Sequence, residues 1–219
     1  MIDLHTARTA TRRVRRAFLG ATLAALIGAP TAFAGSPGQA LLIASMAAPA
    51  PALSTTTAVS YPYAPWLTDE AYYLSLVNCT RTGGWVLSNG TCRGYGTGRY
   101  SAYVRPLVRS GAISDRVTRP YAKLIAIRAL CNHFYDGDPG LRLRRAGFVG
   151  YAWGENIGCR DGYGTTRAAV LQSHLFFQAE RSTNGGHWRN IKNPRYTYIG
   201  IGVWHYGNRT RLVTDFYRP

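Results

Sequence analysis

The sequence predicts an α+β domain in which amphipathic helices are combined with a C-terminal β-hairpin. Acidic residues follow Thr68, and the pair Thr165-Thr166 precedes a long apolar run. Both patterns are typical of helix starts. Gly207-Asn208 separates two segments with alternating apolar residues, which is typical of a hairpin. Residues 61–219 are enough for one hydrophobic core, so we expect a single domain.

The first helix is expected from an N-cap at Thr68 to about Arg81. Residues 83–98 contain six glycines and are expected to form a loop. Pro120 is expected to begin a second helix that ends in the segment CNHF (131–134), because proline is tolerated in a first turn.

The later elements are expected in the order short basic helix, long helix and two hairpin strands: 141–146, 165–180, 197–206 and 209–217. The long helix is apolar on two sides, which favours a position between layers. In the first hairpin strand, Gly200 and Gly202 share a face on which another backbone or a ligand can approach closely.

The N-terminus has the three parts of an export signal. Five arginines lie between positions 8 and 16, an apolar segment covers 18–27, and Ala32-Phe33-Ala34 is a small-x-small cleavage site. We expect residues 1–34 to be a cleaved signal peptide, and RRAFLG also has the twin-arginine pattern, which leaves the export route open. Residues 35–60 are rich in Ala, Pro, Ser and Thr and are expected to be a linker before the domain at 61–219. The mature protein is then secreted and has no transmembrane segment.

The chain is strongly basic, with 26 Lys and Arg against 10 Asp and Glu and a formal net charge of +16. Without residues 1–34, which hold five Arg and one Asp, the charge is still near +12. The arginines are scattered rather than striped, so we expect non-specific attraction to anionic polymers and no specific nucleic-acid partner.

Four cysteines form an even set suited to an oxidising compartment, and none has the C-x-x-C spacing of a zinc ribbon or thioredoxin site. Three pairings are possible, and sequence proximity favours Cys79–Cys92 and Cys131–Cys159. The second pairing would bring His133, two residues after one cysteine, close to Glu155, four residues before the other.

Several motifs, taken in order, resemble the CAP superfamily, also called SCP domains: CNHF, WGENIGC (153–159), FFQAE (176–180), GGHWRN (185–190) and TDFY (214–217). The resemblance covers about residues 67–217. It implies a three-layer α-β-α sandwich with a small antiparallel sheet between helices. It also implies a cleft with two histidines and two acidic residues, which match His133, Glu155, Glu180 and His187.

The resemblance leaves three functions open. The first is an extracellular module that binds a lipid or cell-envelope ligand in this cleft, and the second is a metal-dependent hydrolase. In the hydrolase, His133 and His187 would bind zinc or another divalent ion, with the tetrad performing the catalysis. The third is a secreted effector acting on a partner protein. The glycine- and tyrosine-rich loop after Cys92 departs from the family, so the ligand can differ too.

Other titratable residues are expected to be structural. We expect His174 to be packed on a helix and His205 to be part of a strand. Asp136 and Asp138 are expected to form a turn, because the 12-residue calcium loop is absent.

Overall fold

The structure, a computed structural model, describes residues 64–219. The signal peptide and linker predicted over 1–60 lie outside the described residues. The elements, in chain order, are α1 (Leu67–Arg81), β1 (Trp85–Val86), β2 (Cys92–Arg93), β3 (Val108–Arg109), α2 (Gly111–Ile113), the π-helical segment η1 (Ser114–Thr118), α3 (Arg119–Ile127), α4 (Pro139–Arg145), β4 (Ala152–Asp161), α5 (Thr166–Ala179), the 3-10 segment η2 (Glu180–Thr183), α6 (Gly186–Lys192), β5 (Tyr198–Tyr206) and β6 (Arg209–Arg218).

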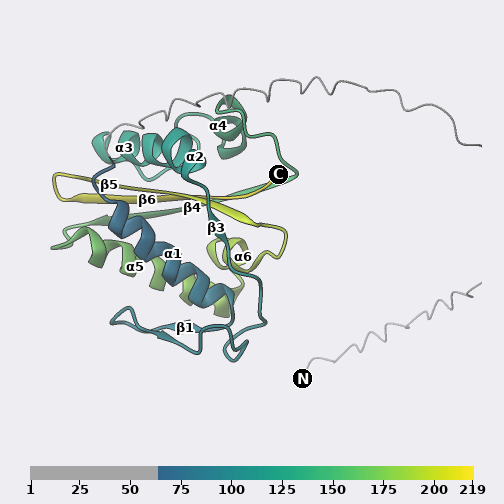
Figure 1. Ribbon diagram of the computed structural model, residues 1–219. Helices are drawn as coiled ribbons and strands as arrows, with labels where there is room; N and C mark the ends of the chain where they lie inside the picture. Colours follow the sequence, from purple (N-terminus) through teal and green to yellow (C-terminus); the bar gives the residue numbers. More distant parts are fainter. Residues whose placement is uncertain (1–63) are drawn as a thin grey trace, which may run out of the picture. The chain divides into compact units, whose positions relative to one another are not determined.

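A four-stranded sheet in the order β3-β5-β6-β4 separates two layers of helices (Figure 1). One face is covered by α1, α5 and α6, and the other by α2, α3 and α4. The three-layer α-β-α arrangement is therefore confirmed. No helix within residues 64–219 is both long and apolar enough to cross a bilayer.

The predicted hairpin is present, because β5 and β6 pair antiparallel through the turn at Gly207-Asn208. Strand β4 pairs antiparallel with β6 along its full length, while β3 pairs parallel with β5. Both β3 and β4 are thus edge strands. Residues 154–158 of β4 are all buried, so this strand lacks the polar and apolar alternation by which a half-buried strand is found in a sequence.

The α1/α5 face of the sheet contains the largest part of the core. Ile199, Ile201 and Val203 alternate along β5 and pack with Val170 and Phe177 of α5. The other side of α5 is covered too, since Leu171 and Leu175 pack against Cys79 and Val86, as the expected position between layers requires.

The opposite face of β5 is nearly bare, which lets the second layer come very close. A Cβ atom on Gly202 would lie 2.3 Å from the backbone carbon of Thr118, and one on Gly200 would lie 2.2 Å from Cγ2 of Ile113. Real Cβ contacts are not this short, so both positions require glycine. The predicted close approach of a backbone is confirmed.

Two helix boundaries differ from the prediction. The first helix begins at Leu67, so Thr68 lies inside its first turn instead of capping it. The second helical run begins after Ser110, whose hydroxyl caps the N–H of Ile113, continues through η1 and ends at Ile127, before CNHF. Pro120 follows the π-helical turn, where the regular hydrogen-bond ladder is already interrupted, so its missing N–H is tolerated inside the run.

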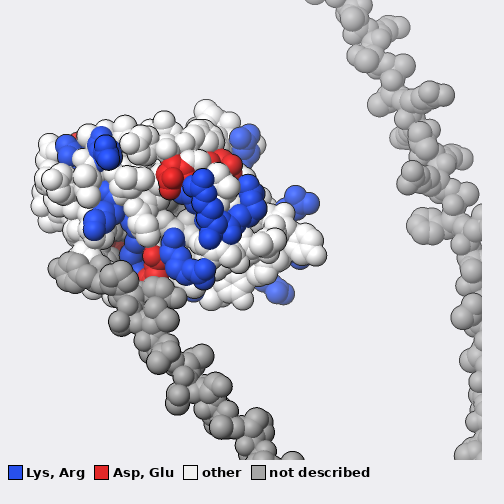
Figure 2. Space-filling view, turned by 90° about the horizontal axis from the view of Figure 1, so that it is seen from above, with Lys and Arg blue, Asp and Glu red and all other residues white. Residues whose placement is uncertain are grey.

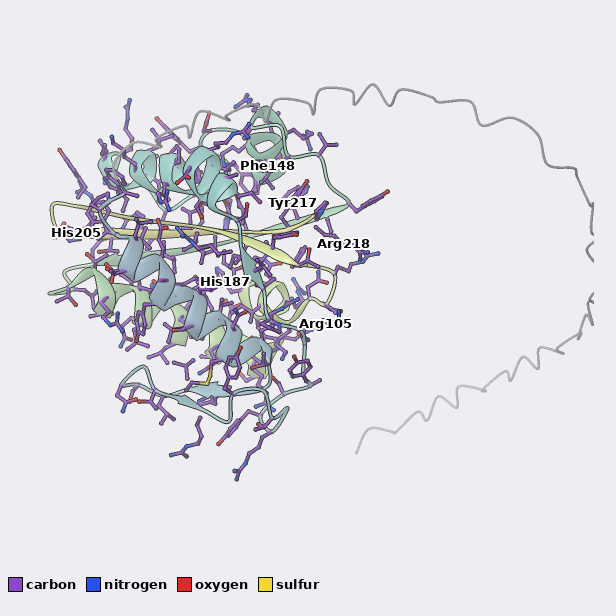
Figure 3. All side chains as sticks on the ribbon, in the orientation of Figure 1. Arg105, Phe148, His187, His205, Tyr217 and Arg218 are labelled. Carbon is purple, nitrogen blue, oxygen red and sulfur yellow. A yellow bond between two sulfur atoms is a disulfide. The ribbon has the colours of Figure 1, made fainter. Side chains whose placement is uncertain are left out.

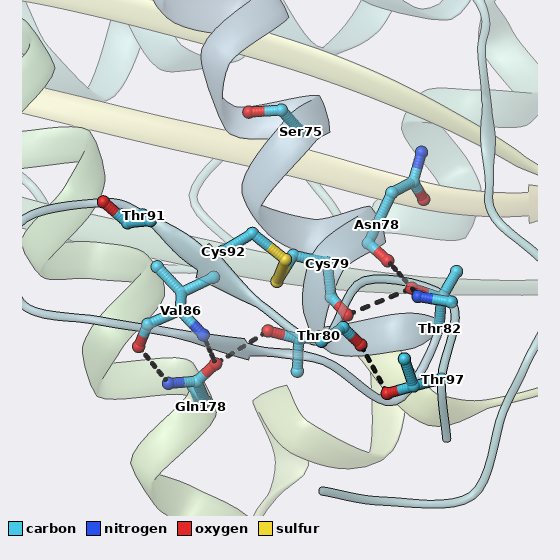
Figure 4. Close-up of a disulfide and its surroundings, with 12 residues drawn as sticks. Ser75, Asn78, Cys79, Thr80, Thr82, Val86, Thr91, Cys92, Thr97 and Gln178 are labelled. Atoms are coloured by element: carbon cyan, nitrogen blue, oxygen red, sulfur yellow. Dashed lines mark hydrogen bonds between the residues drawn. A yellow bond between two sulfur atoms is a disulfide. The ribbon is translucent and has the colours of Figure 1, made fainter. Parts of the chain in front are cut away.

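The glycine-rich segment 83–98 was expected to be only a loop, but it contains the antiparallel pair β1 and β2. The Cys79–Cys92 disulfide attaches this pair to α1 (Figure 4). Gln178 of α5 holds it from the other side, since its side-chain amide accepts from the N–H of Val86 at 2.9 Å and donates to the carbonyl of Val86 at 2.9 Å.

A buried arginine fixes the segment around α6. The Arg81 guanidinium donates to the carbonyls of Ile191 (2.7 Å), Asn193 (2.9 Å) and Tyr196 (2.7 Å). Burial lowers the pKa of Arg81 to about 10. These bonds connect the end of α1 with the end of α6, and so support the element that contains His187.

Candidate functional site

Strand β4 positions the first acidic residue of the site. It has a neighbouring strand on one side only, so its free edge lies between the two helix layers. Glu155 is in the middle of β4, directly opposite Asp215 of β6. Opposed side chains share a face of a sheet, and Asp215 is also opposite Gly200, whose α-carbon lies under α2. Glu155 and Asp215 therefore point towards the α2/α3 layer.

His133 reaches Glu155 from the loop after α3. The predicted disulfide Cys131–Cys159 joins this loop to β4, and the Tyr121 hydroxyl donates to the carbonyl of Asn132 at 2.5 Å. The Nδ1 atom of His133 lies 2.7 Å from Oε1 of Glu155. Because a carboxylate only accepts, Nδ1 is the protonated nitrogen and Nε2 is left for other contacts. The disulfide thus places His133 at Glu155, as its spacing predicted.

The Glu155 carboxylate is buried and has a second, permanently charged partner. Its Oε2 accepts from Nη2 of Arg142, a residue of α4 that is only 6% exposed. Arg142 also donates to the carbonyls of His133 (2.8 Å) and Gly137 (2.6 Å). Its guanidinium lies 3.6 Å from the ring centre of Tyr121. A buried carboxylate needs such a partner, so Arg142 compensates the charge that Glu155 brings into the interior.

Asp215 is a further buried carboxyl beside this ion pair. It is 0% exposed, and neither of its oxygens has a hydrogen-bond partner within 64–219. Burial raises its pKa well above 3.8, and the neighbouring charge of Glu155 raises it further, while Arg142 acts in the opposite direction. Two adjacent carboxylates would repel each other, so the surroundings of Asp215 favour its neutral form.

His187 and Glu180 form a second pair on the other helix layer. Oε1 of Glu180 accepts from Nδ1 of His187 at 2.7 Å, and Oε2 accepts from the His187 backbone N–H at 2.9 Å. Burial of Glu180 favours the neutral acid, but the hydrogen bonds and charge of His187 outweigh it, so the pKa of Glu180 lies below 4.5. Nε2 of His187 again remains for other contacts.

Gly185, two residues before His187, is required for a steric reason. His187 was expected in a glycine turn, but it belongs to the first turn of α6, for which Gly185 is the N-cap. A Cβ on Gly185 would lie 2.4 Å from Oε2 of Glu180, so only glycine lets the chain pass this carboxylate. The His187 ring stacks on Phe177 with centroids 4.3 Å apart, which fixes its orientation.

The two histidines line one cleft of about 240 Å³ at the free edge of β4. Its lining residues are Cys131, Asn132, His133, Ile157, Cys159, Arg160, Phe176 and His187. Figure 3 labels His187 beside α6, below the sheet, whereas His133 comes from the layer above it. Phe176 is 52% exposed and gives the cleft an apolar wall, while Arg160 lies over its ring at 5.3 Å.

The four predicted residues form two His–Glu pairs, and of the four only the histidines line the cleft. The carboxylates bind the Nδ1 atoms, which leaves two imidazole Nε2 atoms as the donors available to a metal. Residues 64–219 contain no group of three or more His, Cys, Asp or Glu placed to hold a metal ion. The other two histidines within residues 64–219 lie where expected, since His174 is fully buried in α5 and His205 bonds Thr210 in the hairpin. Asp138 caps α4 through the N–H of Leu141.

Three residues of this arrangement were missed in the sequence: Arg142, Arg160 and Asp215. Arg142 is one of three arginines in a helix predicted only as basic, and nothing in that pattern indicates which of them points inward. Asp215 belongs to the motif TDFY, in a strand that is buried on both faces. Its burial became visible only from the register with β4.

No protein-family model matches the sequence, and no curated protein does. Among solved structures, an outer surface protein from Borrelia burgdorferi is 14% identical, with 70% of this chain and 94% of that chain covered and a TM-score of 0.51. An extracellular protein containing an SCP domain from Bacillus anthracis is 20% identical, covering 69% of this chain and 41% of that chain, with a TM-score of 0.47. NaASP2 with Zn2+ is 16% identical, covering 68% and 78%, with a TM-score of 0.45.

This chain spans less than half of the Bacillus protein, and identities this low concern the fold alone. The three layers and the order of elements are those that the motifs implied. The chain therefore shares a fold with the Borrelia protein, and this fold has the three-layer arrangement that the resemblance to SCP domains implied.

Proposed function

We propose that this chain is an exported binding module that holds the polar end of an amphipathic cell-envelope ligand in the cleft between His133 and His187. The composition of the cleft supports this proposal most directly. Imidazoles from both helix layers and the Arg160 guanidinium are gathered beside the apolar surface of Phe176 and Ile157. Such a combination suits a ligand with an anionic or hydroxylated head and an apolar body. The signal-like N-terminus supports an encounter outside the cell.

The cleft volume of about 240 Å³ is smaller than the roughly 300–1,000 Å³ of pockets that enclose drug-sized ligands. It fits a head group, with the rest of the ligand lying over Phe176 and the aromatic surface near it. Phe134 is 68% exposed and lies next to His133, with ring centroids 6.0 Å apart. These two phenylalanines would contact the apolar part of the ligand.

Sedimentation with phosphatidylglycerol vesicles tests this function. The measurement needs about 0.5 M salt, because a basic protein is otherwise attracted to any anionic surface. We expect the folded His133→Ala/His187→Ala and Phe176→Ala variants to bind at least tenfold more weakly than wild type. His205→Ala, which removes a half-buried histidine outside the cleft, is the matched control and should bind normally. Unchanged binding by both cleft variants would contradict the proposal.

A second candidate function, metal binding, is favoured by one specific observation. Both imidazoles have their Nδ1 atoms fixed by a carboxylate, which is the outer-shell arrangement found around metal-binding histidines. His133 and His187 would hold the ion through Nε2, and Glu155 and Glu180 would orient the rings. A bound ion would supply Lewis-acid chemistry or an activated water. Two protein ligands are one fewer than the three of most catalytic zinc sites.

Calorimetric titration of Zn2+ separates the two functions. Binding that is lost in His133→Ala/His187→Ala but kept in Phe176→Ala would support a metal site. Absence of binding in the folded wild type would remove the metal site and leave the amphipathic ligand as the leading candidate. Glu180→Gln should weaken Zn2+ binding roughly 10- to 100-fold, as losses of outer-shell partners do.

A further inference from the structure

A larger cavity lies outside the cleft, in the helix layer formed by η1, α3 and α4. Its volume is about 440 Å³, and its walls include Arg116 from η1, Pro120 and Leu124 from α3, and Arg142 and Arg145 from α4. Figure 2 looks onto this layer and shows basic side chains gathered beside acidic ones. None of the tetrad residues lines this cavity.

The cavity has an apolar floor and a basic rim. Val117, Pro120, Leu124 and Ala146 supply the apolar surface. Arg145 is exposed, and its Nη1 lies 3.5 Å from Asp136, too far apart for a strong ion pair in water. Arg116 donates to the carbonyl of Ala146 and lies 5.1 Å above the ring of Phe148. Both guanidinium groups keep donors for a further partner.

A third, buried guanidinium lines the same cavity. Arg142 is 6% exposed, and its Nε is a buried donor without a partner among the described residues. An unsatisfied buried donor is costly, and an anion in the cavity would satisfy it. The charge of Arg142 is already matched by Glu155, and Asp136 offsets one of the two charges of Arg116 and Arg145, so about one positive charge at this site is uncompensated.

We propose that this cavity binds a phosphate group that is attached to an apolar chain. Guanidinium groups suit phosphate because their planar fork donates two parallel hydrogen bonds. Arg116 and Arg145 contact the phosphate oxygens from the rim, and the apolar chain lies over Pro120 and Leu124. Asp136 competes with the phosphate for Arg145.

The cavity is connected to the cleft through two of its lining residues, Arg142 and Tyr121. Arg142 and Tyr121 line the cavity, and on their other side Arg142 bonds Glu155 and the carbonyl of His133, while Tyr121 bonds the carbonyl of Asn132. A phosphate that draws on Arg142 therefore acts on the two elements that orient His133. The site itself does not depend on the function proposed for the cleft.

Calorimetric titration of the mature chain with inorganic phosphate and with monobutyl phosphate tests the site. We expect Arg116→Ala/Arg145→Ala to raise both dissociation constants at least tenfold. Arg144→Ala/Arg128→Ala removes two exposed arginines that do not line the cavity and should change them less than twofold. Equal losses in the two double variants would overturn the proposal, because they would indicate a non-specific field.

Two further variants give results that misfolding cannot imitate. Asp136→Asn should strengthen phosphate binding several-fold, because it removes the competing carboxylate. Leu124→Ser should abolish the preference for monobutyl phosphate over phosphate while leaving inorganic phosphate bound. A wild type without that preference, or an Asp136→Asn variant that binds phosphate more weakly, would overturn the proposal.

Sedimentation with phosphatidic acid vesicles distinguishes a lipid head group from a soluble phosphate ester. The measurement is made at about 0.5 M salt, which suppresses non-specific attraction. Sedimentation lost in Arg116→Ala/Arg145→Ala but kept in His133→Ala/His187→Ala would support a lipid head group in this cavity. Binding of monobutyl phosphate without vesicle binding would support a soluble phosphate ester. Because the cleft variants leave this cavity intact, failure of one proposal is distinguishable from failure of the other.

Discussion

The disulfide Cys131–Cys159 offers a direct test of how the cleft is built. It joins the loop that contains His133 to strand β4, which contains Glu155. Cys131→Ser/Cys159→Ser removes this connection and leaves both residues of the pair in the chain. Cys79→Ser/Cys92→Ser is the matched control, because it removes the other disulfide, which attaches β1 and β2 to α1 outside the cleft.

The two variants should lose similar amounts of stability. In the chain-entropy description, a disulfide stabilises the fold by lowering the conformational entropy of the unfolded chain. The effect grows with the logarithm of the loop length. The sequence separations are 28 for Cys131–Cys159 and 13 for Cys79–Cys92. These give about 3.6 and about 2.9 kcal/mol at 25 °C. Global stability alone therefore cannot separate the variants by more than about 1 kcal/mol.

Local order at His133 should separate them clearly. Without Cys131–Cys159, the loop is still held by the bonds from Tyr121 and Arg142, but its covalent attachment to β4 is gone. We expect the NMR signals of the His133 ring to move towards random-coil positions, and binding to the cleft to weaken at least tenfold. In the control variant both should stay as in wild type, at a matched loss of stability in urea unfolding.

The reasoning fails if the His133 signals and the binding are unchanged in folded Cys131→Ser/Cys159→Ser. It also fails if both variants lose them equally, because the effect would then come from global stability. The first result would mean that the hydrogen bonds to Glu155 and Arg142 place His133 without the disulfide.

Two buried groups should give opposite pH dependences of stability. Burial lowers the pKa of His174 from 6.5 to about 3, so the unfolded chain binds a proton below pH 6.5 that the folded chain does not. Stability is then lost by about 1.4 kcal/mol per pH unit as the pH falls towards 3. Urea unfolding at pH 6.5 and 4.5 should favour His174→Gln over wild type by about 2 kcal/mol more at the lower pH, and a constant difference would contradict this. Asp215 has its pKa raised above 3.8 by burial and by Glu155, so the folded chain keeps a proton that the unfolded chain releases, and stability is lost as the pH rises from 3.8. Asp215→Asn should therefore gain thermal stability over wild type between pH 4 and pH 7, whereas a shrinking gain would show that Asp215 is ionised in the fold.

The elements that the sequence predicted well are those with local signals. Thr165 caps α5 through the N–H of Ala168, and Gly207 has the positive φ of 63° that the hairpin turn requires. The start of the second helical run was wrong because Pro120 is a strong but ambiguous signal. The actual start depends on Ser110, which caps the short helix α2. The π-helical turn that follows has no recognisable hydrophobic period, so the sequence gives no sign of a helix there.

The sequence predicted the four His and Glu residues of the candidate site but not the buried residues that contact them. Cysteine spacing was sufficient to place His133 beside Glu155, because a disulfide is a covalent constraint between distant positions. Arg142 and Asp215 have no such constraint in the sequence. Their burial depends on which side of α4 and which register of β6 is used, and both are set by packing between elements far apart in the chain.

The position of β4 explains why histidines from opposite layers can line one cleft. The middle strands of a sheet separate the layers that they support, so side chains from the two layers cannot approach each other there. At an edge strand the separation ends, and β4 has no neighbour beyond β6. His133 reaches this edge from the α3 layer, and His187 reaches it from the α5/α6 layer. Glu155 binds His133 on one side of the sheet, and Glu180 binds His187 on the other. A sheet extended by one more strand beyond β4 would keep both His–Glu pairs but would fill the cleft, so the free edge of β4 is as necessary to the site as the four side chains.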